Sequence, residues 1–258
     1  MNRSLRSLAA ALALAAPAPL LADDAEIHTF HCLHGCPMGA AETNDLVVRE
    51  IYTLSSNDLT KFADWVAYRV TVDTVAKSKA IRNWQADPWL AEDETLEEPD
   101  YEGARAALDT DRGHQAPLAA FSGTPTWADT NIFSNITPQD QDLNQGTWEK
   151  LEARERQWVM STNKSLFVLT GPLYERPMPP MPGADEPHRV PSGYWKVLAT
   201  EDGRVTAFIF DQATPRNTPY CTGRKTLEEV ESRAVLKLFP RVTQRSFASL
   251  DADLGCQP

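Results

Sequence analysis

A histidine in the middle of the chain lies beside an arginine, in the segment Asp111-Arg-Gly-His-Gln-Ala-Pro117. The imidazole of His114 can accept a proton at neutral pH, because its unperturbed pKa is ~6.5. A guanidinium such as that of Arg112 binds phosphate oxygens through paired hydrogen bonds. An Asn/Glu pair follows downstream and adds oxygen ligands. This combination is much less expected by chance than a lone histidine, and it indicates acid–base chemistry beside a phosphate.

The Asn/Glu pair belongs to a row of residues spaced for one face of a helix. Asn144, Trp148, Glu152 and Arg156 are each four positions apart, and such residues line up along a helix. The polar members of the row would point at a site, while Trp148 would anchor the helix to the core. The alternative is a surface ion pair between Glu152 and Arg156, worth about 0.3–0.5 kcal/mol and without function. The spacing alone favours that alternative.

Strands and helices that could position these residues occur in separate blocks, which predicts an α+β fold. Thr200-Glu-Asp-Gly203 carries the Asp-Gly pair of a hairpin turn, and Thr226 begins a capping box. A turn at residues 55–58 would join the first two strands as an antiparallel pair. The predicted strands are residues 46–52, 65–72, 165–169, 194–199 and 204–210, and the predicted helices are residues 146–161 and 226–238.

Residues 1–22 have the layout of a secretory signal peptide. Arg3 and Arg6 precede a short apolar run that ends near Ala22. Prolines interrupt the run, and it is a poor match to the about 20 apolar residues of a membrane-spanning helix. We expect cleavage near Ala22 and export to the periplasm or the medium; an uncleaved anchor is the alternative. Residues 23–258 are expected to form a single domain.

The four cysteines are expected to form disulfides, because export leads to an oxidising compartment. Of the three pairings that four cysteines allow, the close spacing of Cys32 and Cys36 favours a local clip, which leaves Cys221 to bond Cys256. The longer loop should contribute more stability. The run from His28 to Cys36 is also rich in zinc ligands, and zinc is the alternative, although its spacing matches no standard finger.

Two long segments are irregular. Residues 87–111 contain ten acidic residues and a single basic one, Arg105. A solvated loop is the first interpretation of this acidic run, and calcium binding is the sharper alternative. Residues 172–191 contain seven of the 19 prolines and predict a stiff surface loop. Strand signals resume after each segment, so neither is interpreted as a domain linker.

Three blocks together resemble the signature of the DNA/RNA non-specific endonucleases, and most closely that of the secreted bacterial sugar-non-specific nucleases. They are the segment around His114, residues 130–139 and residues 143–152. Cys32-Leu-His-Gly-Cys36-Pro also resembles the disulfide loop of that group, and residues 191–197 resemble one of its core strands. The resemblance implies the ββα-metal (His-Me finger) nuclease fold, with a central antiparallel sheet flanked by helices.

The resemblance also implies a role for each matching residue. His114 matches the general base that takes a proton from the attacking water. Asn144 matches the direct ligand of Mg²⁺, for which Mn²⁺ is a substitute, and Glu152 matches the residue that holds the metal-bound waters. Asp111 matches a structural position. The remaining matches bind the phosphate or lie beside it, namely Arg82, Arg112, Asn135 and Arg156.

The implied function is hydrolysis of phosphodiester bonds in DNA and RNA, single or double stranded, by a secreted endonuclease. A metal-bound water would protonate the leaving group, and the products would carry 5′-phosphate and 3′-hydroxyl ends. Contacts to phosphate rather than to base edges imply low sequence specificity. The alternatives are a catalytically weak extracellular module that binds nucleic acid, and a phosphodiesterase for another substrate. A monomer and a homodimer are both compatible with the sequence.

The acidic balance of the chain bears on how a nucleic acid would bind. The chain has 25 Lys+Arg against 36 Asp+Glu, a net charge of −11. Loss of the two arginines in residues 1–22 leaves 23 basic and 36 acidic residues, a charge of −13. Bulk charge therefore opposes a polyanion. Ten of the acids crowd into residues 87–111, so the negative charge is unevenly distributed along the sequence. The predicted site needs only a few well-placed positive groups. The acidic surroundings repel a nucleic acid, so we expect weak, quickly reversed substrate binding that depends strongly on a divalent cation.

Overall fold

The computed structural model describes residues 26–75 and 81–257, and the predicted signal peptide lies outside them. Ten strands occur in this part of the chain, together with four α-helices and one π-helical turn, Leu143–Trp148. The α-helices are Ala104–Leu108 (α1), Leu118–Phe121 (α2), Glu149–Thr162 (α3) and Leu227–Ala234 (α4). The strands are Asp45–Val48 (β1), Tyr52–Asn57 (β2), Phe62–Val70 (β3), Thr110–His114 (β4), Ile136–Asp140 (β5), Leu166–Leu173 (β6), Gly193–Ala199 (β7), Arg204–Asp211 (β8), Arg224–Lys225 (β9) and Ala248–Ser249 (β10).

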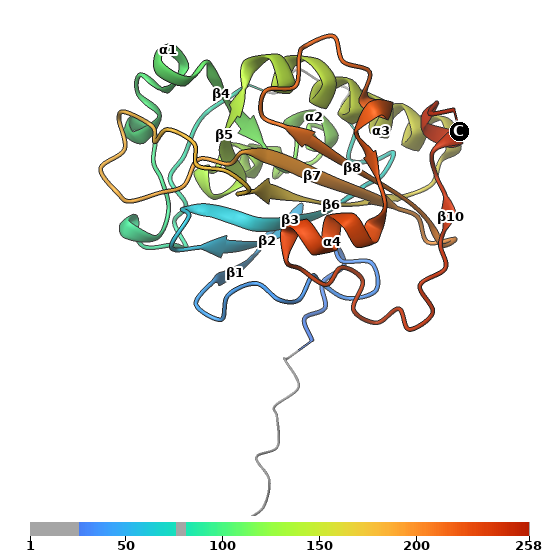
Figure 1. Ribbon diagram of the computed structural model, residues 1–258. Coiled ribbons are helices and arrows are strands. Elements are labelled where there is room, and N and C mark those ends of the chain that lie inside the picture. The colour runs from blue at the N-terminus through green and yellow to red at the C-terminus, as the bar shows by residue number, and fades with distance from the viewer. Residues whose placement is uncertain (1–25, 76–80, 258) are drawn as a thin grey trace, which may run out of the picture.

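An eight-stranded sheet forms the centre of the molecule (Figure 1). Its strand order is β1-β2-β3-β6-β7-β8-β10, with β9 paired to β8. Every pair in it is antiparallel except β10 with β8. The predicted α+β class with a central antiparallel sheet is therefore confirmed.

Helices cover both faces of this sheet, α2 and α3 on one side and α4 on the other (Figure 1). The alternation of β7 shows the division. Tyr194 and Leu198 pack toward α3, whereas Trp195 and Val197 pack toward α4. Both sides are buried, which explains why β7 is apolar along nearly its whole length.

The two strands β4 and β5 pair with each other outside the large sheet. His114 ends β4, and the chain runs from β5 into the π-helical turn and α3. The hydroxyl of Tyr194 donates to the carbonyl of Pro138 at 2.9 Å, which ties β5 to strand β7 of the large sheet. The strand–strand–helix unit is thus fixed to the α3 side of the core.

The first predicted strand, residues 46–52, is wrong as a single element. The chain turns at residues 49–51, so that β1 and β2 form separate strands, and most of the predicted turn at 55–58 lies inside β2. The backbone N–H of Arg49 closes the turn by donating to the carbonyl of Tyr52 at 2.9 Å, and its side chain is buried in an ion pair with Asp87 at 2.5 Å. Ser55, which suggested a turn, accepts a hydrogen bond from Asn44 instead.

The predicted helices differ from the observed ones mainly at their ends. The first begins earlier, with the π-helical turn, and ends at Thr162. The second ends at Ala234, because Val235 adopts a left-handed backbone conformation with φ of 55°. Thr226 caps its N-terminus as predicted, since its side chain accepts a hydrogen bond from the backbone of Glu229 at 3.1 Å.

The cysteines pair as expected, Cys32 with Cys36 and Cys221 with Cys256. Both sulfur atoms of the N-terminal pair are consumed, which removes the zinc alternative. His31 in the same run is also engaged, because its ring nitrogens lie 2.9 Å from the Thr53 hydroxyl and 3.1 Å from a backbone carbonyl. This loop is a structural clip.

The two irregular segments pack against each other instead of extending into solvent. Residues 87–111 form two 3-10 turns and α1, and they bury Leu96 and Tyr101. The proline-rich loop between β6 and β7 contributes Met181 and Val190 to the same small apolar cluster. Eight of the ten acidic residues in 87–111 are exposed or half-buried, as a solvated loop predicts, but the same segment also contributes Leu96, Tyr101 and Ala104 to a third core.

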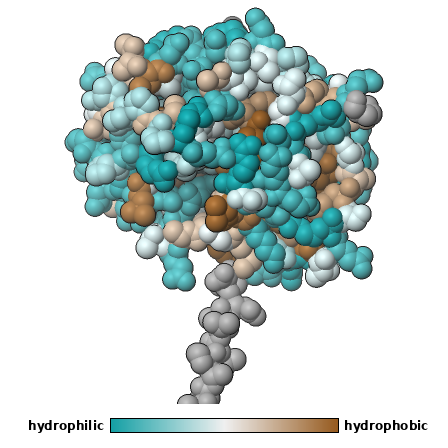
Figure 2. Space-filling view, in the orientation of Figure 1, coloured by the Kyte–Doolittle hydropathy of each residue, from teal (hydrophilic) through white to brown (hydrophobic). Residues whose placement is uncertain are grey.

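The surface is mostly hydrophilic in the view of Figure 2, where apolar residues are scattered between polar ones. In the part of the chain that the structure describes, no helix combines the length and the apolar character needed to cross a membrane.

Candidate active site

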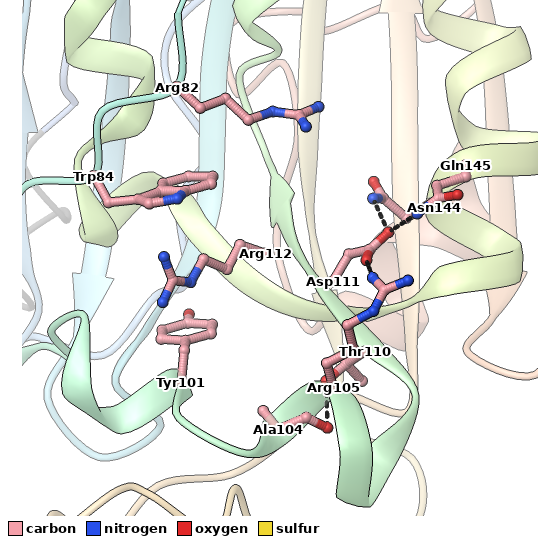
Figure 3. A pocket seen from close by; sticks show the side chains of 10 residues that line it. All are labelled: Arg82, Trp84, Tyr101, Ala104, Arg105, Thr110, Asp111, Arg112, Asn144 and Gln145. Carbon is pink, nitrogen blue, oxygen red and sulfur yellow. Dashed lines mark hydrogen bonds and ion pairs between the residues drawn. The ribbon is translucent and has the colours of Figure 1, made fainter.

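Six of the seven residues predicted for the site line one hollow of about 560 Å³ between β4, α3 and the segment that contains Arg82. A second hollow of about 440 Å³ adjoins it and shares four of its lining residues (Figure 3). The structure thus brings together residues that lie up to 74 positions apart in the sequence. The six are Arg82, Arg112, His114, Asn144, Glu152 and Arg156.

The imidazole of His114 is oriented by an asparagine that the sequence analysis did not single out. Its Nε2 lies 3.1 Å from Oδ1 of Asn131. An amide oxygen only accepts hydrogen bonds, so we assign the proton to Nε2, which leaves the lone pair of Nδ1 for a substrate proton. Burial lowers the pKa of His114 to about 4, with Arg82 acting in the same direction and the Asn131 hydrogen bond opposing it. The ring is therefore neutral at neutral pH, as a general base requires.

The side chain of Asn144 is held by Asp111 (Figure 3). Its Nδ2 donates to Oδ2 of Asp111 at 2.9 Å, and this carboxylate also accepts from Gln145 at 2.6 Å and from Arg105. The amide nitrogen is thereby committed, while no donor of the described chain reaches Oδ1 of Asn144. The arrangement presents an amide oxygen, and oxygen is the ligand atom that Mg²⁺ and Ca²⁺ prefer. Asp111, which matched a structural position, acts here by orienting Asn144.

Glu152 lies on α3 at the edge of the hollow, with its side chain 12% exposed. Its Oε1 is 3.4 Å from Nζ of Lys196. Burial raises the pKa of Glu152 to about 7, although Lys196 opposes the shift. The partner of Glu152 is thus a buried lysine instead of Arg156, and the alternative of a surface ion pair between Glu152 and Arg156 is wrong.

The arginines supply the positive charge of the site. Arg82 is exposed and lines both hollows. The guanidinium of Arg112 lies between the rings of Trp84 and Tyr101, at 5.2 and 5.7 Å from their centres (Figure 3). Its Nη1 also donates to Glu98 at 2.9 Å. Aromatic faces of this kind stabilise a cation and restrict its orientation.

A π-helical turn at the start of α3 places Asn144 in the hollow while Trp148 is buried in the core. Such turns occur frequently at functional sites. Gly146 in this turn lies so close to the carbonyl of Arg216 that an added Cβ would be 2.3 Å from that oxygen. The turn therefore requires glycine at this position. The four-residue spacing predicted that Trp148 is buried. It did not predict the π-helical turn, which allows Trp148 to be buried while Asn144 faces the hollow.

Asn135 is the one predicted site residue that does not line the hollow. It is fully buried. Its Oδ1 accepts a hydrogen bond from the backbone N–H of Ala116, and its Nδ2 donates to the carbonyls of Ala116 and Thr130. These contacts fix the loop after β4, so the side chain has no atom left for a substrate. Asn131, four residues earlier, makes the contact with His114. The sequence could have indicated Asn131 as a candidate, because it lies only four residues from Asn135 in the same motif block.

A separate acidic cluster lies in the irregular segments. Carboxylate oxygens of Glu97, Asp100 and Glu186 lie within 4.8 Å of one another. Burial and the neighbouring carboxylates raise the pKa of Glu97 to about 7. Asp100 accepts a hydrogen bond from the backbone of Glu97 at 2.6 Å, which gives it a structural role. Calcium binding by residues 87–111 stays a prediction.

The sequence model of the DNA/RNA non-specific endonucleases matches residues 35–245. The chain belongs to this family. A nuclease of Serratia marcescens is 45% identical over 233 residues, which cover 88% of this chain and 87% of that protein. Human mitochondrial endonuclease G is 30% identical over 129 residues, 49% of this chain and 42% of that one. A crystal structure of an EndoG/EndoGI complex has the same fold, with a TM-score of 0.66 at 22% identity over 79% of this chain and 89% of that chain.

The family and the site agree on the type of reaction. Members of this endonuclease family hydrolyse phosphodiester bonds, and the hollow combines a neutral imidazole with three guanidinium groups and a free amide oxygen. The chain is a nuclease of the phosphodiester hydrolase class, and DNA and RNA fit it as substrates.

Proposed function

We propose that this endonuclease is Mg²⁺-dependent and cuts DNA and RNA, single or double stranded, to 5′-phosphate and 3′-hydroxyl ends. The convergence of His114, Asn144 and Glu152 on one hollow with three arginines carries the proposal. All of these groups would contact phosphate, water or metal and none would read a base edge, which supports low sequence specificity.

His114 acts as the general base in this proposal. Nδ1 takes a proton from the attacking water, while Asn131 holds Nε2–H and so fixes the ring. Arg82, Arg112 and Arg156 bind the phosphate oxygens and stabilise the charge that develops on them. The rings of Trp84 and Tyr101 keep the Arg112 guanidinium in place before a substrate arrives.

The residues of the hollow fit a hard divalent cation. Asn144 would bind it through Oδ1, which is left without a donor when Asp111 engages the amide nitrogen. Glu152 would accept hydrogen bonds from its water ligands, which agrees with the tendency of Mg²⁺ to retain several waters. When bound, the ion would neutralise charge on the phosphate and the leaving oxygen and supply an acidic water for the leaving group. Mn²⁺ has similar ligand preferences and should substitute.

Export is the second part of the proposal. The signal-like residues 1–22 and the two disulfides both favour an oxidising compartment outside the cytoplasm, either the periplasm or the medium.

The test is to incubate the purified protein with supercoiled plasmid and with RNA, in Mg²⁺, in Mn²⁺ and in EDTA. We expect both substrates to be degraded with either metal and neither with EDTA. Nicked plasmid should be sealed by DNA ligase, which joins only 5′-phosphate to 3′-hydroxyl ends. An intact plasmid and intact RNA after incubation in Mg²⁺ would overturn the proposed function, and nicks that ligase cannot seal would overturn the proposed ends.

A further inference from the structure

A single lysine lies in the otherwise apolar middle of strand β7. Lys196 is fully buried, and it lies between Tyr194 and Leu198 on the face that packs toward α3. It pairs in register with Thr170 on one side and Phe208 on the other, at the centre of the sheet. A charge at such a position is strongly disfavoured unless partners compensate for the lost water.

The partners of Lys196 come from the helix that carries the site. Its Nζ lies 3.1 Å from Oε1 of Glu155 and 3.4 Å from Oε1 of Glu152. It also lies 3.3 Å from the hydroxyl of Tyr68 and 4.3 Å from the ring centre of Trp148. The Lys196 cation therefore contacts the carboxylates of Glu152 and Glu155, which are three positions apart on the same face of α3.

The two carboxylates differ in what surrounds them. Glu155 is 1% exposed and its Oε2 accepts from the hydroxyl of Tyr68 at 3.3 Å, so it lies wholly inside the core. Glu152 is 12% exposed and lines the hollow that contains His114. Among the described residues, none donates a hydrogen bond to Oε2 of Glu152. Lys196 thus contacts both carboxylates, and of the two only Glu152 faces the hollow.

We propose that Lys196 is a positioning residue, which holds Glu152 by Oε1 so that Oε2 is presented to the water ligands of the catalytic cation. This inference rests on the proposed function, because it assigns a purpose to the Glu152 carboxylate. Groups that orient the partners of a metal site in this way typically change metal affinity or activity by about 10- to 100-fold when removed. The competing view is that Lys196 serves only to neutralise Glu155 within the core.

Three variants separate these two roles. Lys196→Met removes the cation and leaves two buried carboxylates, so it should destabilise the fold. Glu155→Gln keeps Lys196 beside Glu152 and removes only the core partner. The double variant Lys196→Met/Glu155→Gln removes both members of the core pair, so its thermal midpoint should return toward that of Glu155→Gln. Comparison of the double variant with Glu155→Gln then isolates the effect of Lys196 on Glu152 in proteins of similar stability.

The readout that does not depend on turnover is Mn²⁺ binding in the absence of nucleic acid, measured by electron paramagnetic resonance. kcat and the Mg²⁺ concentration for half-maximal rate are measured beside it, and circular dichroism establishes that each variant is folded. We expect the double variant to bind Mn²⁺ at least about tenfold more weakly than Glu155→Gln and to have a lower kcat, with KM for nucleic acid nearly unchanged.

Equal Mn²⁺ affinity and equal kcat in the double variant and in Glu155→Gln would overturn the inference and leave Lys196 as a partner of Glu155 alone. That outcome differs from failure of the proposed function, in which the wild-type protein itself would not cleave nucleic acid in Mg²⁺.

Discussion

One histidine on each side of the central sheet has a pKa that is lowered to about 4, in both cases mainly by burial. On the side of α4, both ring nitrogens of His31 bond groups of the protein, Thr53 and the carbonyl of Glu50. On the side of α3, His114 uses Nε2 for Asn131 and keeps Nδ1 free toward the hollow. The same shift therefore has different consequences, because only His114 has an unpaired nitrogen within reach of a substrate.

The surroundings of the two histidines differ in the same way. The α4 face is mainly apolar, with side chains such as Trp195, Val197 and Ile209, and a disulfide closes its edge. The α3 face buries Lys196 and Glu155 among its aromatic residues. One face is built for stability, while the other retains polar groups that stability alone does not require. Variants on the two faces should therefore separate stability from catalysis.

The largest loss of stability is expected from Trp195→Ala on the α4 face. Trp195 is fully buried, and its ring packs so closely on Gly171 that an added Cβ there would lie 2.9 Å away. Truncation of such a side chain leaves a cavity and costs about 3–5 kcal/mol. Urea unfolding measures the loss, and kcat per folded molecule should stay near the wild-type value below the transition. A large fall in kcat of the folded fraction would show that the two faces are not separable.

The next largest effect is expected from the C-terminal disulfide. Cys221 and Cys256 close a loop with a sequence separation of 35, whereas Cys32 and Cys36 are separated by 4. In the chain-entropy estimate, loss of the long loop costs about 4 kcal/mol and loss of the short one about 2 kcal/mol. The order of the two stability losses is tested by thermal unfolding of two double variants, in which both cysteines of one bridge are replaced by serine. Equal losses would mean that the contacts of the loops, and not their lengths, determine the contribution.

His31 should make stability depend on pH. The unfolded chain binds its proton near pH 6.5 and the folded protein only near pH 4, so the contribution is complete above 6.5 and is lost as the pH falls toward 4. A shift of this size corresponds to about 3 kcal/mol. Urea unfolding of the wild type and of His31→Asn at pH 7 and pH 4.5 measures it. The variant should lose less stability on acidification, and parallel losses would contradict the role of His31.

The parts of the fold that sequence patterns predicted are those where apolar side chains alternate or repeat. Strands β3, β7 and β8 and the Thr226 cap agree with the expected positions within a few residues. Strand β4 has the sequence Thr-Asp-Arg-Gly-His, which carries no apolar alternation. Its conformation comes from pairing with β5, and its side chains serve the site, so no periodic pattern could reveal it.

The site residues that the sequence did not reveal act through contacts between distant segments. In the sequence, Lys196 is a charged residue within an apolar strand and has no evident partner. Only the fold brings its Nζ within 3.4 Å of Glu152. Asn131 bonds the ring of His114 whereas Asn135 bonds only backbone, and the sequence alone does not show which of the two lies at the site. The family signature fixes the spacing of its residues along the chain, and this made His114, Asn144 and the arginines predictable. A tertiary contact between distant segments leaves no such spacing in the sequence.

The central claim, that the α3 face carries a nuclease site with His114 as its base, is tested most directly by the kcat of His114→Ala in Mg²⁺, with His31→Asn as the matched control. Loss of a general base typically lowers the rate about 10²- to 10⁴-fold. We predict that His114→Ala loses activity on both plasmid and RNA by such a factor while its unfolding midpoint stays close to that of the wild type, and that His31→Asn is less stable but keeps its kcat. A His114→Ala protein that cleaves plasmid at nearly the wild-type rate would contradict the account.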